Sequence, residues 1–112
     1  MASQYRGHER IDQRSLAMHR AIAAKLRHDP GLIAIALDNL DRWSRKRVRA
    51  QPYLDEWREI LQRPLPDVLA LIVEESEHMT AMRQTSPFAG ILAPAERWAI
   101  YEKFPLEQKA ES

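Results

Sequence analysis

One pair of side chains has a spacing that can bind metal ions, Glu75 and His78 within "EESEH". Residues three positions apart share a helix face, and Glu-x-x-His is the spacing used in di-iron helical bundles. Such a bundle needs two of these pairs, with further carboxylates on facing helices. Because the sequence contains only one, we interpret "EESEH" as a solvated acidic face, and we predict no metal or cofactor site.

A second pair with catalytic potential is Arg14 and His19, within "RSLAMH". Its Arg-x4-His spacing resembles the motif of HEPN ribonucleases, which are also small helical bundles that dimerise. That resemblance implies an arginine that stabilises phosphate charge, a histidine that acts as acid or base, and a homodimer. In that family the motif lies late in the chain, whereas here it lies in the first predicted helix. A ribonuclease is therefore kept as an alternative.

Other catalytic arrangements are missing from the sequence. Ser76 lies beside Glu75 and His78, but residues one or two positions apart on a helix do not face each other. The chain has no cysteine, which excludes disulfides, thiolate zinc sites and a cysteine nucleophile. It also has no glycine-rich phosphate-binding loop. We therefore predict that the protein is not an enzyme.

A basic run around Trp43 could contact phosphates without sequence specificity. Its members are Arg42, Arg45, Lys46, Arg47 and Arg49. A helix-turn-helix needs a short turn followed by a helix that reads bases, but the helix after "RHDPGLI" is apolar. Cations at the C-terminal end of a helix also complement its dipole. A nucleic-acid-binding regulator, with DNA as its partner, is therefore a second alternative.

Residue types that anchor protein interfaces gather near the C-terminal end of the sequence. In "RQTSPFAGILAPAERWAIYEKF" aromatic and apolar residues alternate with arginines. The predicted partner-binding residues are Arg83, Pro87, Phe88, Ile91, Leu92, Arg97, Trp98, Tyr101 and Phe104. The other interpretation of this segment is that it folds back and seals the chain's own core, so that "SPFAGIL" has two open roles.

Helices separated by prolines must position these residues. Apolar side chains recur every three or four positions, which predicts helices over residues 9–28, 30–46, 52–63, 66–85 and 94–104. Asp29 before Pro30 is expected to cap the second helix. Few β-branched runs occur, which argues against a sheet. The sequence predicts an all-α fold, a compact bundle of about five helices joined by short, proline-marked turns.

Length and composition indicate one domain. The chain has 112 residues, of which 1–8 and 106–112 are expected to be frayed. No apolar run approaches the ~20 residues of a membrane span, and the first residues carry no signal-peptide core. These features and the absence of cysteine predict a cytoplasmic protein.

The net charge of +1 conceals a division between the two halves of the sequence. Residues 1–50 hold 11 Lys and Arg against 5 Asp and Glu, which gives +6, and residues 51–112 hold 6 against 11, which gives −5. The halves could neutralise each other within one domain. They could also present a basic face and an acidic face to different partners.

Two stretches, "RSLAMHRAIAAKLRHDPGLIAIALDNLDRW" and "RQTSPFAGILAPAERWAIYEKF", resemble small and mostly uncharacterised bacterial helical proteins. We associate these with the antitoxin partners of two-gene toxin–antitoxin modules. The resemblance spans about residues 14–104, and it implies that the chain binds and neutralises a toxin enzyme encoded by a neighbouring gene. Many antitoxins also repress their own operon through DNA, but this chain lacks a clear DNA-reading module. The main hypothesis is therefore a non-enzymatic protein whose acidic half meets a basic enzyme.

Overall fold

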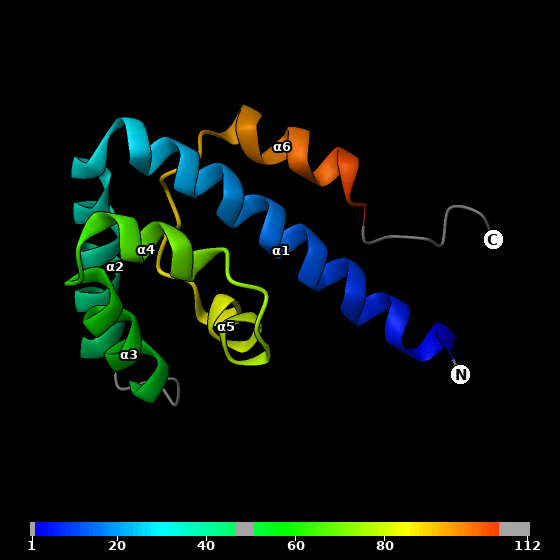
Figure 1. Cartoon of the computed structure of the whole chain (residues 1–112), viewed down its shortest axis with the longest axis horizontal. Helices are drawn as coiled ribbons and strands as arrows, with labels where there is room; N and C mark the ends of the chain where they lie inside the picture. Colours follow the sequence, from blue (N-terminus) through cyan, green and yellow to red (C-terminus); the bar gives the residue numbers. More distant parts are fainter. Residues whose placement is uncertain (1, 47–50, 106–112) are drawn as a thin grey trace.

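The computed structural model describes residues 2–46 and 51–105, with side chains from Arg10 onwards. These residues form α-helices and short 3₁₀ turns, without a strand among them (Figure 1). The elements are α1 (Ala2–His28), η1 (Pro30–Leu32), α2 (Ile33–Arg45), α3 (Gln51–Leu61), α4 (Leu65–Ile72), α5 (Glu77–Met82), η2 (Arg83–Thr85) and α6 (Pro94–Lys103). The predicted all-α class is confirmed, with six α-helices in the described part instead of about five.

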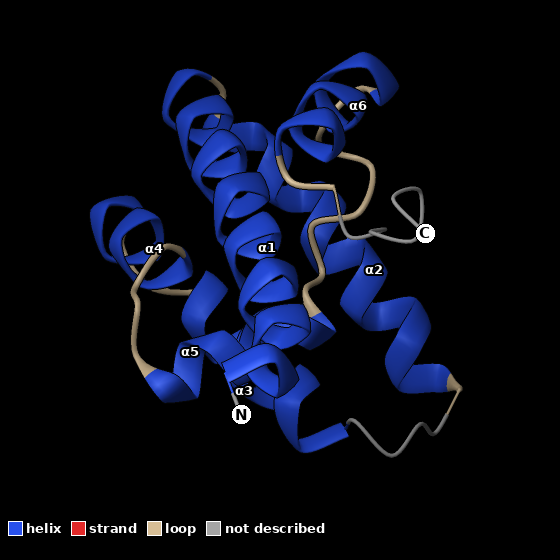
Figure 2. Ribbon diagram, turned by 90° about the vertical axis from the view of Figure 1, so that its right-hand side faces the viewer, coloured by secondary structure: helices blue, strands red, loops and turns tan. Residues whose placement is uncertain are grey.

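The long helix α1 is the centre of the arrangement. Helix α6 lies along one side of α1, and α4 and α5 lie on the opposite side (Figures 1 and 2). Helices α4 and α6 both contact α1, while α3 contacts α2 and α4. Among the described residues, none of the helices is both long enough and apolar enough to cross a membrane.

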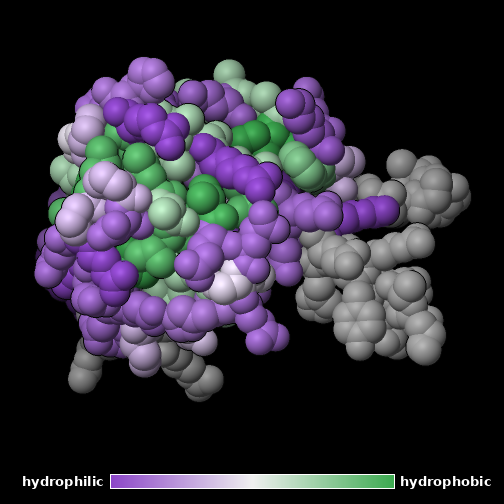
Figure 3. Space-filling model, viewed as in Figure 1, coloured by the Kyte–Doolittle hydropathy of each residue, from purple (hydrophilic) through white to green (hydrophobic). Residues whose placement is uncertain are grey.

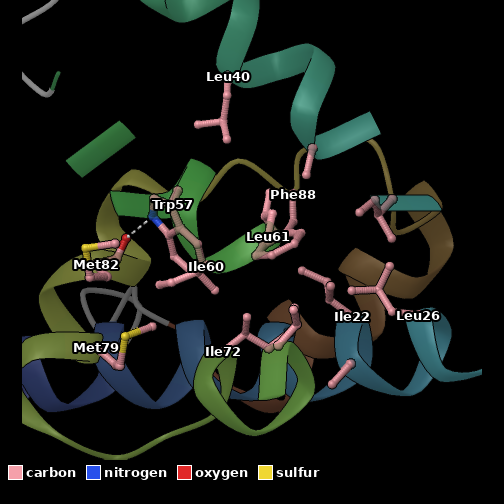
Figure 4. Packing of buried hydrophobic residues seen from close by; sticks show 14 of the residues in the cluster. Ile22, Leu26, Leu40, Trp57, Ile60, Leu61, Ile72, Met79, Met82 and Phe88 are labelled. Carbon is pink, nitrogen blue, oxygen red and sulfur yellow. Dashed lines mark hydrogen bonds between the residues drawn. The ribbon is translucent and has the colours of Figure 1, made fainter. Parts of the chain in front are cut away.

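The hydrophobic core lies where α1 to α5 meet (Figure 4). Trp57 of α3 is fully buried at its centre, and its indole Nε1–H donates to the Met82 carbonyl at 3.0 Å. Other side chains with full burial are Leu26, Leu40, Val68, Ile72 and Met82. Together with Trp57 they come from five different helices, so that burial of each apolar face depends on its neighbours rather than on local helix propensity.

The prediction of one helix over residues 66–85 is wrong. The chain leaves the helix after Ile72 and starts α5 at Glu77. Ser76 between them has extended backbone, and its Oγ accepts a hydrogen bond from the Met79 N–H at 3.1 Å, as an N-cap does. The buried Arg83 donates to the carbonyls of Ile72 and Glu74 at 3.2 and 2.9 Å, so it satisfies the C-terminal end of α4. Hydrogen bonds thus satisfy the end of α4 and the start of α5 on either side of the break.

Other helix ends also differ from the predicted ones. Helix α1 begins at Ala2 and so extends through a stretch that was expected to fray. Asp29 precedes Pro30 as predicted, but its side chain makes no capping hydrogen bond, and the first turn is 3₁₀ rather than α-helical. The predicted fraying of residues 106–112 lies outside the described residues.

Candidate binding cleft

The segment 86–92, "SPFAGIL", seals the chain's own core. Phe88, Ile91 and Leu92 are buried, and Phe88 is only 2% exposed. The Phe88 ring meets the Trp57 ring edge-on at 5.4 Å and the His19 ring edge-on at 5.7 Å. The segment therefore joins α1 to α3, and of its two open roles the structure supports the seal.

Asn39 of α2 holds this segment in place. The side chain is 5% exposed, and its Nδ2 donates to the carbonyls of Pro87 at 2.8 Å and Ala89 at 2.9 Å. Its Oδ1 accepts a hydrogen bond from Arg42. Sequence reasoning missed Asn39, although an amide at a core-facing position of an apolar helix is a signal, since a buried polar group must find partners.

His19 ties α1 to the same segment from the other side. Its Nδ1–H donates to the Ser15 carbonyl at 2.7 Å, because a carbonyl can only accept. In the neutral ring Nε2 is therefore the acceptor, and it accepts a hydrogen bond from the Ser86 hydroxyl at 2.8 Å. Burial lowers the pKa of His19 to about 4, with a smaller contribution from the positive charge of Arg83, while the Ser15 hydrogen bond opposes the shift. The imidazole is neutral at pH 7.

A cleft of about 540 Å³ opens between α1, the 83–92 segment and α6. Its apolar lining comes from Ile11, Met18, Ile22, Phe88 and Leu92. Its polar lining includes Asp12, Arg14, His19, Arg83, Ser86, Arg97 and Tyr101. A mainly apolar cavity with a few convergent polar groups is the usual form of a ligand site.

Helix α6 forms one wall of the cleft without contributing a buried side chain. Glu96 fixes its start, since Oε1 accepts from the Ala93 N–H at 2.6 Å and pairs with Lys25 of α1 at 2.7 Å. These contacts, with the Lys25 hydrogen bond as the larger, lower the pKa of the Glu96 carboxyl. Arg97 donates to the Leu92 carbonyl at 3.1 Å. The start of the helix is thus held by polar contacts, and further along it the half-buried Ile100 packs against the core.

The predicted partner-binding residues separate into two groups. Arg83, Pro87, Phe88, Ile91 and Leu92 are buried within the chain. Arg97, Tyr101 and Phe104 are half-buried, and Trp98 is 64% exposed. Trp98 meets Tyr101 edge-on at 5.8 Å, and the Arg14 guanidinium lies 4.4 Å from the centre of the Tyr101 ring. Only the second group offers an exposed surface to another protein in this conformation.

Arg14 and His19, the predicted ribonuclease pair, line the same cleft. His19 also lies at nucleophile–base distance from Ser86. However, both His19 ring nitrogens are engaged, and a pKa of about 4 leaves no imidazolium to donate a proton near pH 7. The positive Arg83 also opposes formation of that imidazolium. The geometry is that of a structural tie, and the ribonuclease stays a prediction.

The other two candidate sites do not converge on the cleft. Glu75 pairs with Arg20 at 3.2 Å and His78 with Glu56 at 2.6 Å, and the break between α4 and α5 removes the helix that was expected to align them. In the described part of the chain, no three His, Asp or Glu side chains gather as metal ligands do.

The basic run lies at the end of α2. Arg42, Arg45 and Lys46 are exposed there, whereas Arg47 and Arg49 lie outside the described residues. Arg42 has a structural contact through Asn39. Nucleic-acid binding by this run stays a prediction.

Comparisons with protein-family models, with curated proteins and with solved structures gave no match to this chain.

Proposed function

We propose that this chain is a non-enzymatic protein-binding partner and that it binds through a surface shared by α1 and α6. This α1/α6 surface consists of Ile11, Arg14, Arg97, Trp98 and Tyr101. The observation that carries the proposal is the exposure of Trp98, at 64% the most exposed of the large hydrophobic side chains described. Exposed tryptophan beside tyrosine and arginine is the composition of an interface hot spot.

The surroundings of Trp98 support an anchor role. Ile11 is also exposed, and it lines the cleft beside Arg14, Arg97 and Tyr101. Hydrophobic side chains are visible beside α6 on an otherwise largely hydrophilic part of the surface (Figure 3). The ring contact with Tyr101 and the polar attachment of α6 hold Trp98 in position before a partner arrives, which lowers the entropy lost on binding.

Within this proposal the partner is a toxin enzyme encoded by a neighbouring gene, and the complex forms in the cytoplasm. A basic enzyme that acts on nucleic acid suits the net −5 of residues 51–112, from 6 basic and 11 acidic residues. Glu74, Glu75 and Glu77 are exposed around the break between α4 and α5. Opposite charge would speed the encounter, while the α1/α6 surface would supply the apolar contact.

The test is binding of the purified neighbouring gene product to Trp98→Ala. A hot-spot anchor that contributes about 2 kcal/mol gives about 30-fold weaker binding on truncation. Tyr53→Ala is the matched control, because Tyr53 is the exposed aromatic residue of α3. Both variants should keep the unfolding temperature of the parent chain. Equal affinity of Trp98→Ala and the parent chain would exclude the α1/α6 surface as the anchor.

A nucleic-acid-binding regulator is the second candidate. Arg45 and Lys46 are exposed at the end of α2 and form no ion pair with another described residue. Binding through them would weaken steeply with salt and fall further in Arg45→Gln/Lys46→Gln. A gel-shift titration at low salt that shows no retardation of duplex DNA would remove this candidate.

A further inference from the structure

Two arginines at the cleft form no ion pair within the part of the chain that the structure describes. The Arg14 guanidinium stacks on Tyr101, and Arg97 donates one hydrogen bond to a backbone carbonyl. Neither forms an ion pair with a described residue. Each guanidinium carries five donors, so both keep unused hydrogen-bonding capacity at the same opening.

The remaining charges of the cleft do not compensate these two. Burial lowers the pKa of Arg83, and the negative charge of Asp12 is the largest influence that opposes this shift. Among the described residues that line the cleft, Asp12 is acidic whereas Arg14, Arg83 and Arg97 are basic, so positive charge is in excess. The Arg83 guanidinium is occupied by backbone carbonyls. His19 and Ser86 form a neutral pair. The cleft therefore has excess positive charge at Arg14 and Arg97.

Below these cations the cleft is apolar. Met18, Ile22, Phe88 and Leu92 line it, and its volume of about 540 Å³ is within the range of small-molecule sites, roughly 300–1,000 Å³. A ligand that uses both features must combine an acidic head with a hydrocarbon chain. A fully polar anion would leave the apolar lining in contact with water, and a neutral hydrocarbon would leave the two guanidinium groups without an acceptor.

We propose that this cleft binds an amphipathic carboxylate, with its aliphatic chain against the apolar lining and its carboxylate at Arg14 and Arg97. A guanidinium donates two parallel hydrogen bonds to a carboxylate, and such charge-assisted bonds are the strong ones. The ligand class follows from the charge and the lining of the cleft, and it does not depend on the protein partner proposed above.

The probes are decanoate, decanol and acetate, each titrated by calorimetry into the full chain below its micelle or solubility limit. Decanol keeps the chain and removes the charge, and acetate keeps the charge and removes the chain. We expect decanoate to bind at least tenfold more tightly than either. Equal binding of decanol would overturn the carboxylate site, and equal binding of acetate would overturn the apolar site.

Different variants test the arginines of the cleft and its apolar lining. Arg14→Gln/Arg97→Gln should weaken decanoate at least tenfold and leave decanol unchanged. Arg27→Gln/Arg63→Gln is the control for net charge, since both residues are exposed and neither lines the cleft. Ala89→Phe should block the chain, because Ala89 lines the cleft and is itself exposed rather than part of the buried core. Undiminished decanoate binding by Ala89→Phe, or an equal loss in the control variant, would overturn the proposal.

The proposed carboxylate site and the proposed protein interface can be tested separately. Trp98 does not line the cleft, so Trp98→Ala should bind decanoate like the parent chain. Ala89→Phe in turn leaves Trp98 in place. Loss of decanoate binding in Trp98→Ala would contradict the assignment of the ligand to the cleft.

Discussion

Two consecutive segments that both carry aromatic side chains have opposite positions in this molecule. Residues 86–92 and helix α6 both contain aromatic and aliphatic side chains, yet Phe88 is 2% exposed and Trp98 is 64% exposed. The first segment is held by Asn39 and His19, which lie on helices distant in the sequence. The second is attached by Glu96 and Arg97 near its start and by the half-buried Ile100, which packs against the core. Residues 86–92 contain no charged side chain and α6 contains four, so composition favours burial of the first segment, while the contacts with distant helices fix where it is buried.

The largest effect should come from Phe88→Ala. Removing a fully buried phenylalanine leaves a cavity between Trp57 and His19 and should reduce the free energy of unfolding by about 3–5 kcal/mol. Urea denaturation followed by tryptophan fluorescence measures this loss. Phe104→Ala, at a half-buried residue just past the end of α6, is the comparison and should lose less. A loss below about 1 kcal/mol would mean that the segment does not seal the core.

The second-largest effect on stability should be its pH dependence, which we expect to come from His19. Its pKa is about 6.5 in the unfolded chain and about 4 in the folded chain, so the unfolded state binds more protons between these values. The stabilisation is complete above pH 6.5 and is lost as pH falls towards 4, by about 3 kcal/mol from pH 7 to pH 4. His19→Gln should flatten this part of the profile in denaturation experiments at several pH values. If parent and variant lose stability in parallel, His19 is not the titrating group.

Asn39→Ala should have a smaller effect that is specific to the first segment. The change leaves the buried carbonyl of Pro87 and the partly buried carbonyl of Ala89 without their donor, which costs about 2 kcal/mol. Hydrogen exchange should show faster opening of residues 86–92, with α6 little changed. The neighbouring exposed Asp38→Ala is the control. Unchanged exchange of the segment in Asn39→Ala would contradict its role as a tether.

The smallest effect on folding should be that of Trp98→Ala. Because the side chain is mostly in water already, the free energy of unfolding should change by less than about 0.5 kcal/mol. Chemical denaturation measures this value against Phe88→Ala. A loss above 1 kcal/mol would show that α6 belongs to the folding core, and the contrast between the two segments would disappear.

Most helices could be predicted from local patterns. Prolines at residues 30, 52, 64, 66, 87, 94 and 105 separate the apolar stripes, and Pro94 lies at the first position of α6 as expected. The break between α4 and α5 could not be predicted in this way. Ser76 fits an apolar stripe and also an N-cap, and the choice depends on Arg83, whose guanidinium reaches Ile72 and Glu74 only in the folded chain.

The candidate site was predicted only in part. Arg14, His19, Arg97 and Tyr101 were singled out from sequence, but under two different hypotheses, and only the fold brings them to one cleft. Asn39 was not singled out, because the carbonyls that it binds lie 48 and 50 positions away.

The sequence by itself determined the helical class, the proline-marked turns and the uneven charge of the two halves, since these depend on residues close together in the chain. The tertiary structure alone decided that "SPFAGIL" closes the core and that Trp98 remains outside. Burial of an apolar side chain is favourable against any apolar surface. Contacts between helices that are distant in the sequence decide which surface each side chain can reach.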